Sequence, residues 1–253
     1  SMALDQQDIA KIVGEVLKQL EQPLPGASAG QAVSSGGGPV VFATVDAAVQ
    51  AAAKAQRVFQ NLGLEKRRMI IAAMRKAAVA GAEPWARLAR EETGMGRWED
   101  KVQKNLICAK KTPGVEDLQS RSYTGDTGLT LVEYAPYGVV AAVTPSTNPA
   151  ATIINNAISI LSAGNAVVFA PHPAARKVCQ EAMRALHDAA VQAGAPAGVI
   201  TTIDQITQDT TKALLAHPGV QVNMVTGGPA IVKVAMTAGK TCKTIAAGPG
   251  NPP

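Results

Sequence analysis

Aromatic side chains and long apolar runs are scarce in this sequence. Phe, Trp and Tyr together make up 3% of its 253 residues. No apolar run approaches the roughly 18 residues that a membrane-spanning helix needs. A secretory signal combines a basic start with an apolar segment, and no such combination occurs. We therefore expect neither a membrane span nor a secretory signal.

Cysteine is also scarce, with three residues, Cys108, Cys179 and Cys242, far apart in the sequence. The odd number and the absence of a pairing pattern indicate a reducing compartment. None of them has a metal-ligand spacing with any of the three histidines. We expect buried, inert thiols and no metal site.

The net charge of +5 does not indicate a nucleic-acid partner. Nucleic-acid binding needs basic residues gathered on one face, with aromatic residues for stacking on single strands. Here lysine and arginine are scattered in short groups such as Lys66–Arg68 and Lys110–Lys111. A solvated helix surface explains them, and mild positive charge also suits an anionic cofactor.

The two common nucleotide-binding motifs are missing. Gly94 and Gly96 begin a G-x-G-x-x-G pattern, but Glu99 breaks it. There is no Walker A sequence either. A nucleotide would have to bind by another route.

The first 39 residues form two segments of different character. Residues 1–21 have apolar positions at helical spacing, which predicts an amphipathic helix. Residues 22–39 are rich in Pro, Gly, Ser and Ala, which predicts a flexible linker. The helix either folds back on its own domain or docks on another protein.

Residues 46–111 show helical periodicity, with separate helices expected over 67–80 and 84–93 and a stop at Gly94 or Gly96. A turn cluster at 124–128 precedes alternating residues 129–134, which predict a strand.

After residue 138 the pattern changes to an α/β alternation. Five apolar runs, each followed by a turn, lie at 139–143, 166–170, 199–203, 220–225 and 241–246. Helical segments separate them at 151–161, 174–193, 207–215 and 229–237. This order predicts a doubly wound, Rossmann-like parallel sheet covered on both faces, within a domain spanning 40–253.

Ligands of such sheets bind at the carboxyl ends of the strands. Four of these ends carry small, polar or turn-forming residues, at 144–149, 171–173, 226–229 and 247–252. Any one of them is explained by the need to turn the chain. Four at one edge of a sheet indicate a binding site, where glycines allow close approach and helix N-termini offer amides to a phosphate.

At this point the sequence resembles a known family, the CoA-acylating propionaldehyde and acetaldehyde dehydrogenases of bacterial microcompartments. The resemblance runs from about residue 40 to the end, through motifs at 92–96, 111–118, 145–149, 171–173, 226–229 and 248–253. It implies the aldehyde dehydrogenase fold, whose coenzyme domain lacks the usual glycine fingerprint. It also implies oxidation of a short aldehyde through a cysteine thioester, with NAD accepting hydride and CoA accepting the acyl group.

The resemblance assigns residues to the site. Cofactor-binding positions are Thr144, Pro145, Ser146, Thr147, His172, Pro173, Thr226, Gly227, Gly228, Val232, Ala246 and Gly248. Asn148 is the candidate oxyanion donor, although hydrolytic relatives place their asparagine one position earlier; a helix cap is the alternative. His172 stands where those relatives hold the adenosine ribose with lysine; a plain turn residue is the alternative.

Two departures from the hydrolytic relatives matter. Ala246 stands where their glutamate activates water, and alanine cannot act as a general base, which favours CoA as the acyl acceptor. The nucleophilic cysteine is expected beyond Pro253, so this chain alone is expected to bind NAD without oxidising aldehydes. A non-catalytic NAD-binding or shell-docking module and a related NADPH-dependent acyl-phosphate reductase remain alternatives.

The resemblance also implies partners. The helix within residues 3–21 would dock on shell proteins in the lumen of a bacterial microcompartment, and the hairpin at 120–137 resembles a subunit-contact element of a homo-oligomer.

Overall fold

The structure is a computed structural model that describes residues 38–237 and 242–248, all within the unit Gly36–Pro253. The predicted docking helix at 1–21 and nearly all of the predicted linker at 22–39 lie outside the described residues. So does most of the motif at 248–253.

The centre of the fold is a six-stranded sheet in which every neighbouring pair is parallel. Its order is β1-β6-β5-β4-β7-β8. The strands are β1 (Val41–Phe42), β4 (Val139–Thr144), β5 (Ala166–Pro171), β6 (Ile200–Ile203), β7 (Val222–Thr226) and β8 (Lys243–Ala247). The five predicted strands are confirmed. The sequence did not reveal β1, because two residues are too few to show a periodicity.

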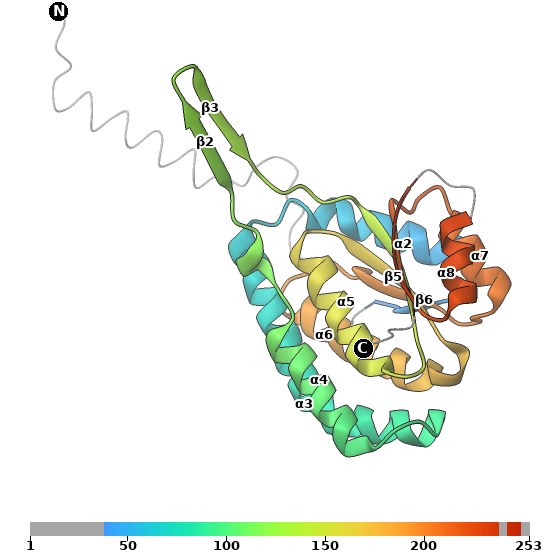
Figure 1. The fold of residues 1–253 in the computed structure, drawn as a ribbon. Coiled ribbons are helices and arrows are strands. Elements are labelled where there is room, and N and C mark those ends of the chain that lie inside the picture. Colours follow the sequence, from blue (N-terminus) through green and yellow to red (C-terminus); the bar gives the residue numbers. More distant parts are fainter. Residues whose placement is uncertain (1–37, 238–241, 249–253) are drawn as a thin grey trace, which may run out of the picture. The chain divides into compact units, whose positions relative to one another are not determined.

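Helices cover both faces of this sheet (Figure 1). One layer packs on the core cluster containing Ile158 and Phe169, and the other on the cluster containing Val168 and Leu214. The first consists of α3 (Leu64–Thr93), α5 (Pro149–Ser162) and α6 (Arg176–Gln192), with α4 (Trp98–Lys111) against α3 and α5. The second consists of α2 (Val45–Phe59), α7 (Gln208–Ala216) and α8 (Pro229–Thr237). The predicted doubly wound α/β architecture is therefore confirmed.

One predicted boundary is wrong, because residues 67–80 and 84–93 belong to the single helix α3, with Pro84 inside it. Pro84 is exposed, and so is Ala80, whose carbonyl loses its usual helical partner and can bind water instead. On the opposite side, a buried stripe continues through Ala82 and Trp85. The helix ends as predicted at Gly94, which adopts the left-handed conformation with φ 70°.

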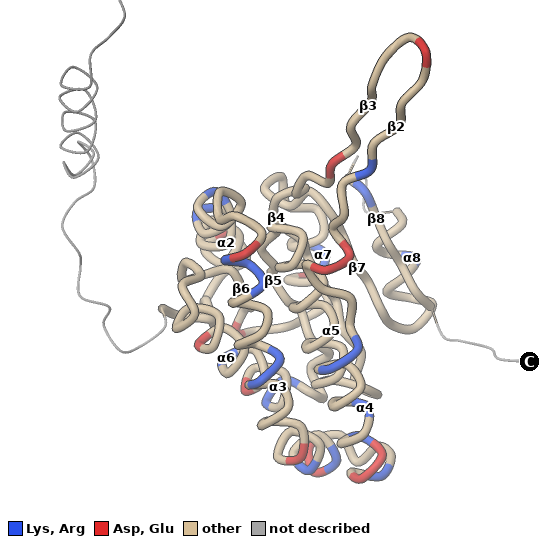
Figure 2. Tube along the Cα trace, turned by 90° about the vertical axis from the view of Figure 1, so that its left-hand side faces the viewer, with Lys and Arg blue, Asp and Glu red and all other residues tan. Residues whose placement is uncertain are grey.

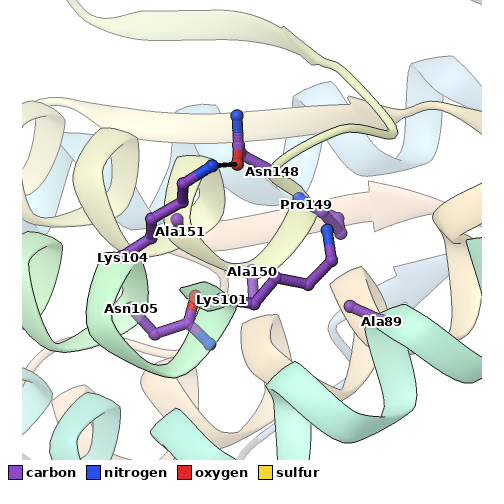
Figure 3. A pocket seen from close by; sticks show the side chains of 8 residues that line it. All are labelled: Ala89, Lys101, Lys104, Asn105, Asn148, Pro149, Ala150 and Ala151. Carbon is purple, nitrogen blue, oxygen red and sulfur yellow. Dashed lines mark hydrogen bonds between the residues drawn. The ribbon is translucent and has the colours of Figure 1, made fainter. Parts of the chain in front are cut away.

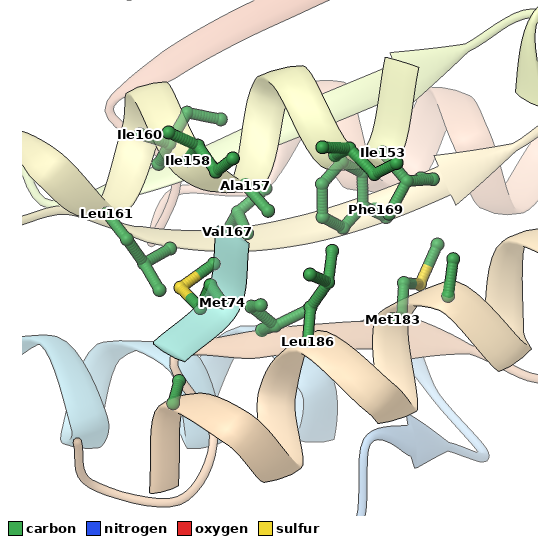
Figure 4. Packing of buried hydrophobic residues seen from close by; sticks show 14 of the residues in the cluster. Met74, Ile153, Ala157, Ile158, Ile160, Leu161, Val167, Phe169, Met183 and Leu186 are labelled. Atoms are coloured by element: carbon green, nitrogen blue, oxygen red, sulfur yellow. The ribbon is translucent and has the colours of Figure 1, made fainter. Parts of the chain in front are cut away.

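The larger core cluster lies between β5 and the helices α3, α5 and α6 (Figure 4). Met74 from α3, Ile153 and Ile158 from α5, and Leu186 from α6 are all fully buried in the same cluster as Phe169 of β5. Small residues in the strands and on the helices allow these layers to approach closely, which explains how so few aromatic residues suffice.

A hairpin extends from the chain between α4 and the sheet. It consists of β2 (Arg121–Gly125) and β3 (Gly128–Val132), paired in antiparallel register with Asp126 and Thr127 in the turn. All ten strand residues are exposed. The predicted hairpin is confirmed, but its turn is shorter than the predicted 124–128 and Tyr134 lies beyond the second strand.

Within the described residues, no helix combines the length and apolar character required to cross a membrane.

Candidate functional site

The sheet has one position where ligands characteristically bind. The neighbouring strands β4 and β7 run parallel, with Val143 opposite Val225. The helix that follows β4, α5, packs on one face of the sheet, whereas the helix that follows β7, α8, packs on the other. The two connecting loops diverge, and such a switch point opens a crevice at the carboxyl ends of the strands.

The predicted convergence of the strand-end loops is confirmed for the described residues. The backbone amide of His172 donates to the carbonyl of Thr144 at 3.0 Å, which joins the loops after β5 and β4. The amide of Gly227 donates to the carbonyl of Ala247 at 3.1 Å, which joins the ends of β7 and β8. Because β4 pairs with β7, all four ends lie along one edge of the sheet.

The loop between β4 and α5 presents only some of its predicted residues. Thr144 is buried, and its hydroxyl lies beside the thiol of Cys179. Pro145 and Ser146 are half-buried, while Thr147 is exposed. The open surface of this loop is therefore formed by the residues after Thr144.

Asn148 is the residue before α5, and its side chain makes no capping hydrogen bond to that helix. The alternative interpretation of Asn148 as a helix cap is therefore wrong for its side chain, since Pro149 occupies the first helical position and the amide points elsewhere. Its Oδ1 accepts a hydrogen bond of 3.0 Å from Nζ of Lys104 on α4 (Figure 3).

A second lysine of α4 holds the same loop. Nζ of Lys101 donates to the carbonyl of Thr147 at 2.8 Å, and only 6% of Lys101 is exposed. Burial, together with the nearby charges of Lys104 and Arg90, lowers the pKa of Lys101. Sequence reasoning missed both lysines, because two lysines three positions apart on a helix normally indicate a solvated face. Lys101 and Lys104 also line a shallow open pocket with Met95, Arg97 and Asn148.

His172 has a structural role in its own loop. Its Nδ1 accepts a hydrogen bond of 3.2 Å from the amide of Ala174, so the ring closes the turn before α6. With Nδ1 accepting, the proton of the neutral ring is on Nε2. The residue is exposed, as is Pro173, and a ribose hydroxyl could accept a hydrogen bond from Nε2.

The turn before α8 has backbone amides without an intrahelical partner, but the amide of Gly227 is not one of them. Gly227 uses its amide within the sheet, so it is not a free donor. A β-carbon on Gly227 would lie 2.6 Å from Cγ2 of Ile231, which explains the glycine. Gly228 has open space around it, and the amides of Ala230 and Ile231 belong to a first helical turn without intrahelical acceptors. An anion fits here.

The remaining predicted residues surround this turn. Thr226 ends β7 and is half-buried, and Val232 in the first turn of α8 packs against the smaller core cluster. Ala246 of β8 lies opposite Val225 and also packs against that cluster. Gly248 is exposed directly after β8.

The start of α6 is closed to ligands. Its preceding residue, Ala175, offers no side-chain cap. Instead, the carboxylate of Glu92, at the end of α3, accepts hydrogen bonds from the amides of Lys177 at 2.8 Å and Val178 at 2.9 Å. The motif at 92–96 therefore closes one helix N-terminus, while that of α8 stays open.

The three thiols are free, but the prediction that all are buried is wrong. Cys179 in α6 is buried, and burial, with the nearby Glu92 carboxylate, raises the pKa of its thiol. Cys108 in α4 is half-buried, and burial raises its pKa as well. Cys242 is also half-buried and lies just before β8 rather than within it. A nucleophilic thiol needs a lowered pKa, so neither Cys108 nor Cys179 fits that role.

Charged residues lie mainly on the outer helices, with basic and acidic residues interspersed along α3 and α4 (Figure 2). Within the described residues, no three His, Cys, Asp or Glu side chains gather in a way that could hold a metal ion.

Comparison with known proteins gives consistent matches. The chain is 48% identical over 251 residues to the acetaldehyde dehydrogenase (acetylating) EutE of Escherichia coli K12, covering 99% of this chain and 52% of that protein. It is 44% identical to the propionaldehyde dehydrogenase of Rhodopseudomonas palustris solved with bound CoA and an acylated cysteine, with a TM-score of 0.81. That match covers 87% of this chain and 49% of the other.

A third match is a propionaldehyde dehydrogenase from the fucose utilisation microcompartment of Clostridium phytofermentans, with 41% identity and a TM-score of 0.81. It covers 85% of this chain and 49% of that one, so the chain spans about half the length of these relatives. The profile of the aldehyde dehydrogenase family matches residues 41–251. With that profile covering most of its length and this sheet at its centre, the chain belongs to the aldehyde dehydrogenase family.

Proposed function

We propose that this chain is the cofactor-binding part of a CoA-acylating aldehyde dehydrogenase that converts propionaldehyde or acetaldehyde to its acyl-CoA. The observation that carries the proposal is the set of four strand-end loops gathered along one edge of the sheet, around the switch point between β4 and β7. The named activities of the similar proteins support it.

The residues at this edge fit a nicotinamide nucleotide. The first turn of α8, after Gly228, would hold the pyrophosphate, and Nε2 of His172 would donate a hydrogen bond to a ribose hydroxyl; the open space at Gly228 and the use of Nδ1 within the loop support these roles. The loop from Pro145 to Asn148 lines the nicotinamide end. When bound, NAD supplies the hydride acceptor. Asn148 holds an amide donor for the developing oxyanion of the substrate.

The identity of residue 246 as alanine favours a thiol over water as the acyl acceptor. Its side chain carries no ionisable group and packs against the core beside α8. Water needs a general base to attack a thioester at a useful rate, whereas the thiol of CoA is already a good nucleophile. The R. palustris relative, which was solved with bound CoA and an acylated cysteine, supports CoA as the acyl acceptor.

The test is an assay of the full-length gene product for NADH formation with short aldehydes. We expect NADH only when both aldehyde and CoA are present, and comparison of NAD with NADP defines the cofactor. NADH formation that is equal without CoA contradicts the acylating assignment. Activity with acyl phosphate and NADPH, but none with CoA, identifies the acyl-phosphate reductase instead.

We also propose that residues 3–21 dock this protein on shell proteins in a microcompartment lumen, which the origin of the C. phytofermentans relative supports. Deletion of residues 1–21 is expected to abolish co-packaging with shell protein while nucleotide binding persists. Unchanged packaging contradicts the docking role.

The hairpin of β2 and β3 is proposed as a subunit contact of a homo-oligomer. Tyr123 and Leu131 are 58% and 59% exposed, and apolar residues displayed on a strand pair favour burial against another chain. Replacing both with serine should lower the oligomeric mass measured by light scattering. An unchanged mass would rule out this contact.

A further inference from the structure

The amide of Asn148 has a fixed orientation in this structure. Its Oδ1 accepts from Nζ of Lys104 at 3.0 Å, and its Nδ2 points away from that lysine (Figure 3). An ammonium group carries donors only, so it bonds to the amide oxygen and disfavours a flipped amide that would turn NH₂ toward it. Within the described part of the chain, Nδ2 has no hydrogen-bond acceptor, so it stays available to a substrate.

The backbone beneath this amide is fixed from the same helix. Lys101, one turn before Lys104, donates to the carbonyl of Thr147 at 2.8 Å. The helix itself is tied to α3, because Nδ2 of buried Asn105 donates to the carbonyl of Ala82 at 2.9 Å. Two consecutive loop residues are thus held by two lysines on a rigid helical layer, which is how a site is pre-organised.

We propose that Lys104 is a positioning residue for the reaction: its bond to Oδ1 turns the Nδ2–H group of Asn148, rather than the amide oxygen, toward the oxyanion that develops on the aldehyde oxygen. This inference rests on the proposed function and deepens it. Lys104 touches neither substrate nor cofactor, and acts through Asn148. An amide free to rotate presents its oxygen part of the time, which repels a developing negative charge.

Lys104 suits a test because its side chain is exposed, so its replacement leaves the core intact. In the full-length enzyme, Lys104→Met should lower kcat on the order of tenfold, less than the loss from removing an oxyanion donor outright. KM for NAD should stay unchanged. Lys104→Arg keeps a donor and should retain most activity. Lys110→Met removes the same charge from an exposed position on the same helix and serves as the matched control.

A double-mutant cycle separates positioning from a structural role. If Lys104 acts through Asn148, then Lys104→Met has little further effect in an Asn148→Ala background. Losses that multiply instead show that Lys104 acts independently of the amide and overturn the proposal. An equal loss of kcat in Lys110→Met also overturns the proposal, because the loss would then reflect the removal of a positive charge rather than of the bond to Asn148.

Neutron crystal structures, which distinguish the amide nitrogen of Asn148 from its oxygen, test the geometry without any activity. In Lys104→Met, the Asn148 side chain should lose its single orientation, while it keeps that orientation in the wild type and in Lys110→Met. An Asn148 side chain that is unchanged in Lys104→Met overturns the positioning role. A wild-type enzyme that forms no NADH with aldehyde and CoA contradicts the proposed function. In that case the crystal structures still show whether Lys104 orients the amide of Asn148.

Discussion

The strand β5 and the hairpin of β2 and β3 show two opposite ways of using β-structure. Every residue of β5 is buried, with helices on both faces of its sheet. Every residue of the hairpin is exposed. A two-stranded hairpin alone is at best marginally stable in water. The difference teaches that the buried strands of this chain hold the fold together, whereas the exposed hairpin contributes little to it.

The largest effect is expected at the centre of the sheet. Phe169 of β5 is fully buried among large side chains from three helices, so Phe169→Ala removes its contacts and leaves a cavity. The free energy of unfolding should fall by about 3–5 kcal/mol. Chemical denaturation measures it, with Phe169→Leu as the milder control. A loss below about 1 kcal/mol would mean that the core relaxes around the cavity and would weaken the contrast with the hairpin.

A smaller effect is expected where a helix of the covering layer is anchored. Glu92→Ala removes the carboxylate that accepts the amides of Lys177 and Val178, and α6 has no cap of its own. Loss of such a cap costs about 0.5–2 kcal/mol of unfolding free energy. The neighbouring exposed Glu91 makes no such bond, and Glu91→Ala is the matched control. Equal losses in both variants would show that general charge, rather than the cap, matters.

A third prediction concerns pH and the same helix. His187 is fully buried in α6 and accepts the amide of Gly198 on Nε2 at 2.9 Å. Burial lowers the pKa of His187, and Asp188 offsets this only in part. The unfolded chain binds a proton as pH falls below about 6.5, while the folded chain resists it until its lower pKa is reached. The stability contributed by His187 is therefore fully present above about pH 6.5, and it is lost progressively as the pH falls from there toward the pKa of the folded chain.

The measurement is the free energy of unfolding at pH 7.5 and pH 5.5. His187→Gln keeps an acceptor for Gly198 without a titrating group, so its stability should fall less over this range than that of the wild type. An equal fall in unfolding free energy for the two proteins would rule out His187 as the source of the pH dependence.

The smallest effect on stability is expected in the hairpin. Leu131→Ser replaces a side chain that is 59% exposed, and such surface changes usually lie within about 0.5 kcal/mol. Denaturation of the monomeric form is the relevant measurement, because association adds stability through mass action. A loss comparable to that of Phe169→Ala would remove the distinction between the two regions.

The sequence predicted the parts of the fold whose signal is local and periodic. The five buried strands are continuous apolar runs, and their order in the chain predicts a parallel sheet. The break expected at Pro84 was wrong because a proline on a solvent-facing side can be tolerated when the buried stripe continues around it. The two-residue strand β1 gives no periodic signal at all.

For the site, sequence reasoning found the loops but not what holds them. Turn-forming residues at strand ends are visible along the chain, and parallel pairing brings them to one edge. The contacts of Lys101, Lys104 and Glu92 join segments far apart in sequence, so no local pattern distinguishes them from residues on a solvated helix. Likewise, the use of the Gly227 amide within the sheet depends on its partner strand.

The strand order has a consequence for how the protein is made. The switch point lies between the carboxyl ends of β4 and β7, where Val143 is opposite Val225, and two further strands and three α-helices are synthesised between these residues. On the ribosome, β4 therefore emerges long before its neighbour, with one edge unpaired and prone to wrong association in the meantime. Assembly of the switch point has to wait until the chain is translated past residue 226, so a nascent chain halted earlier cannot form it.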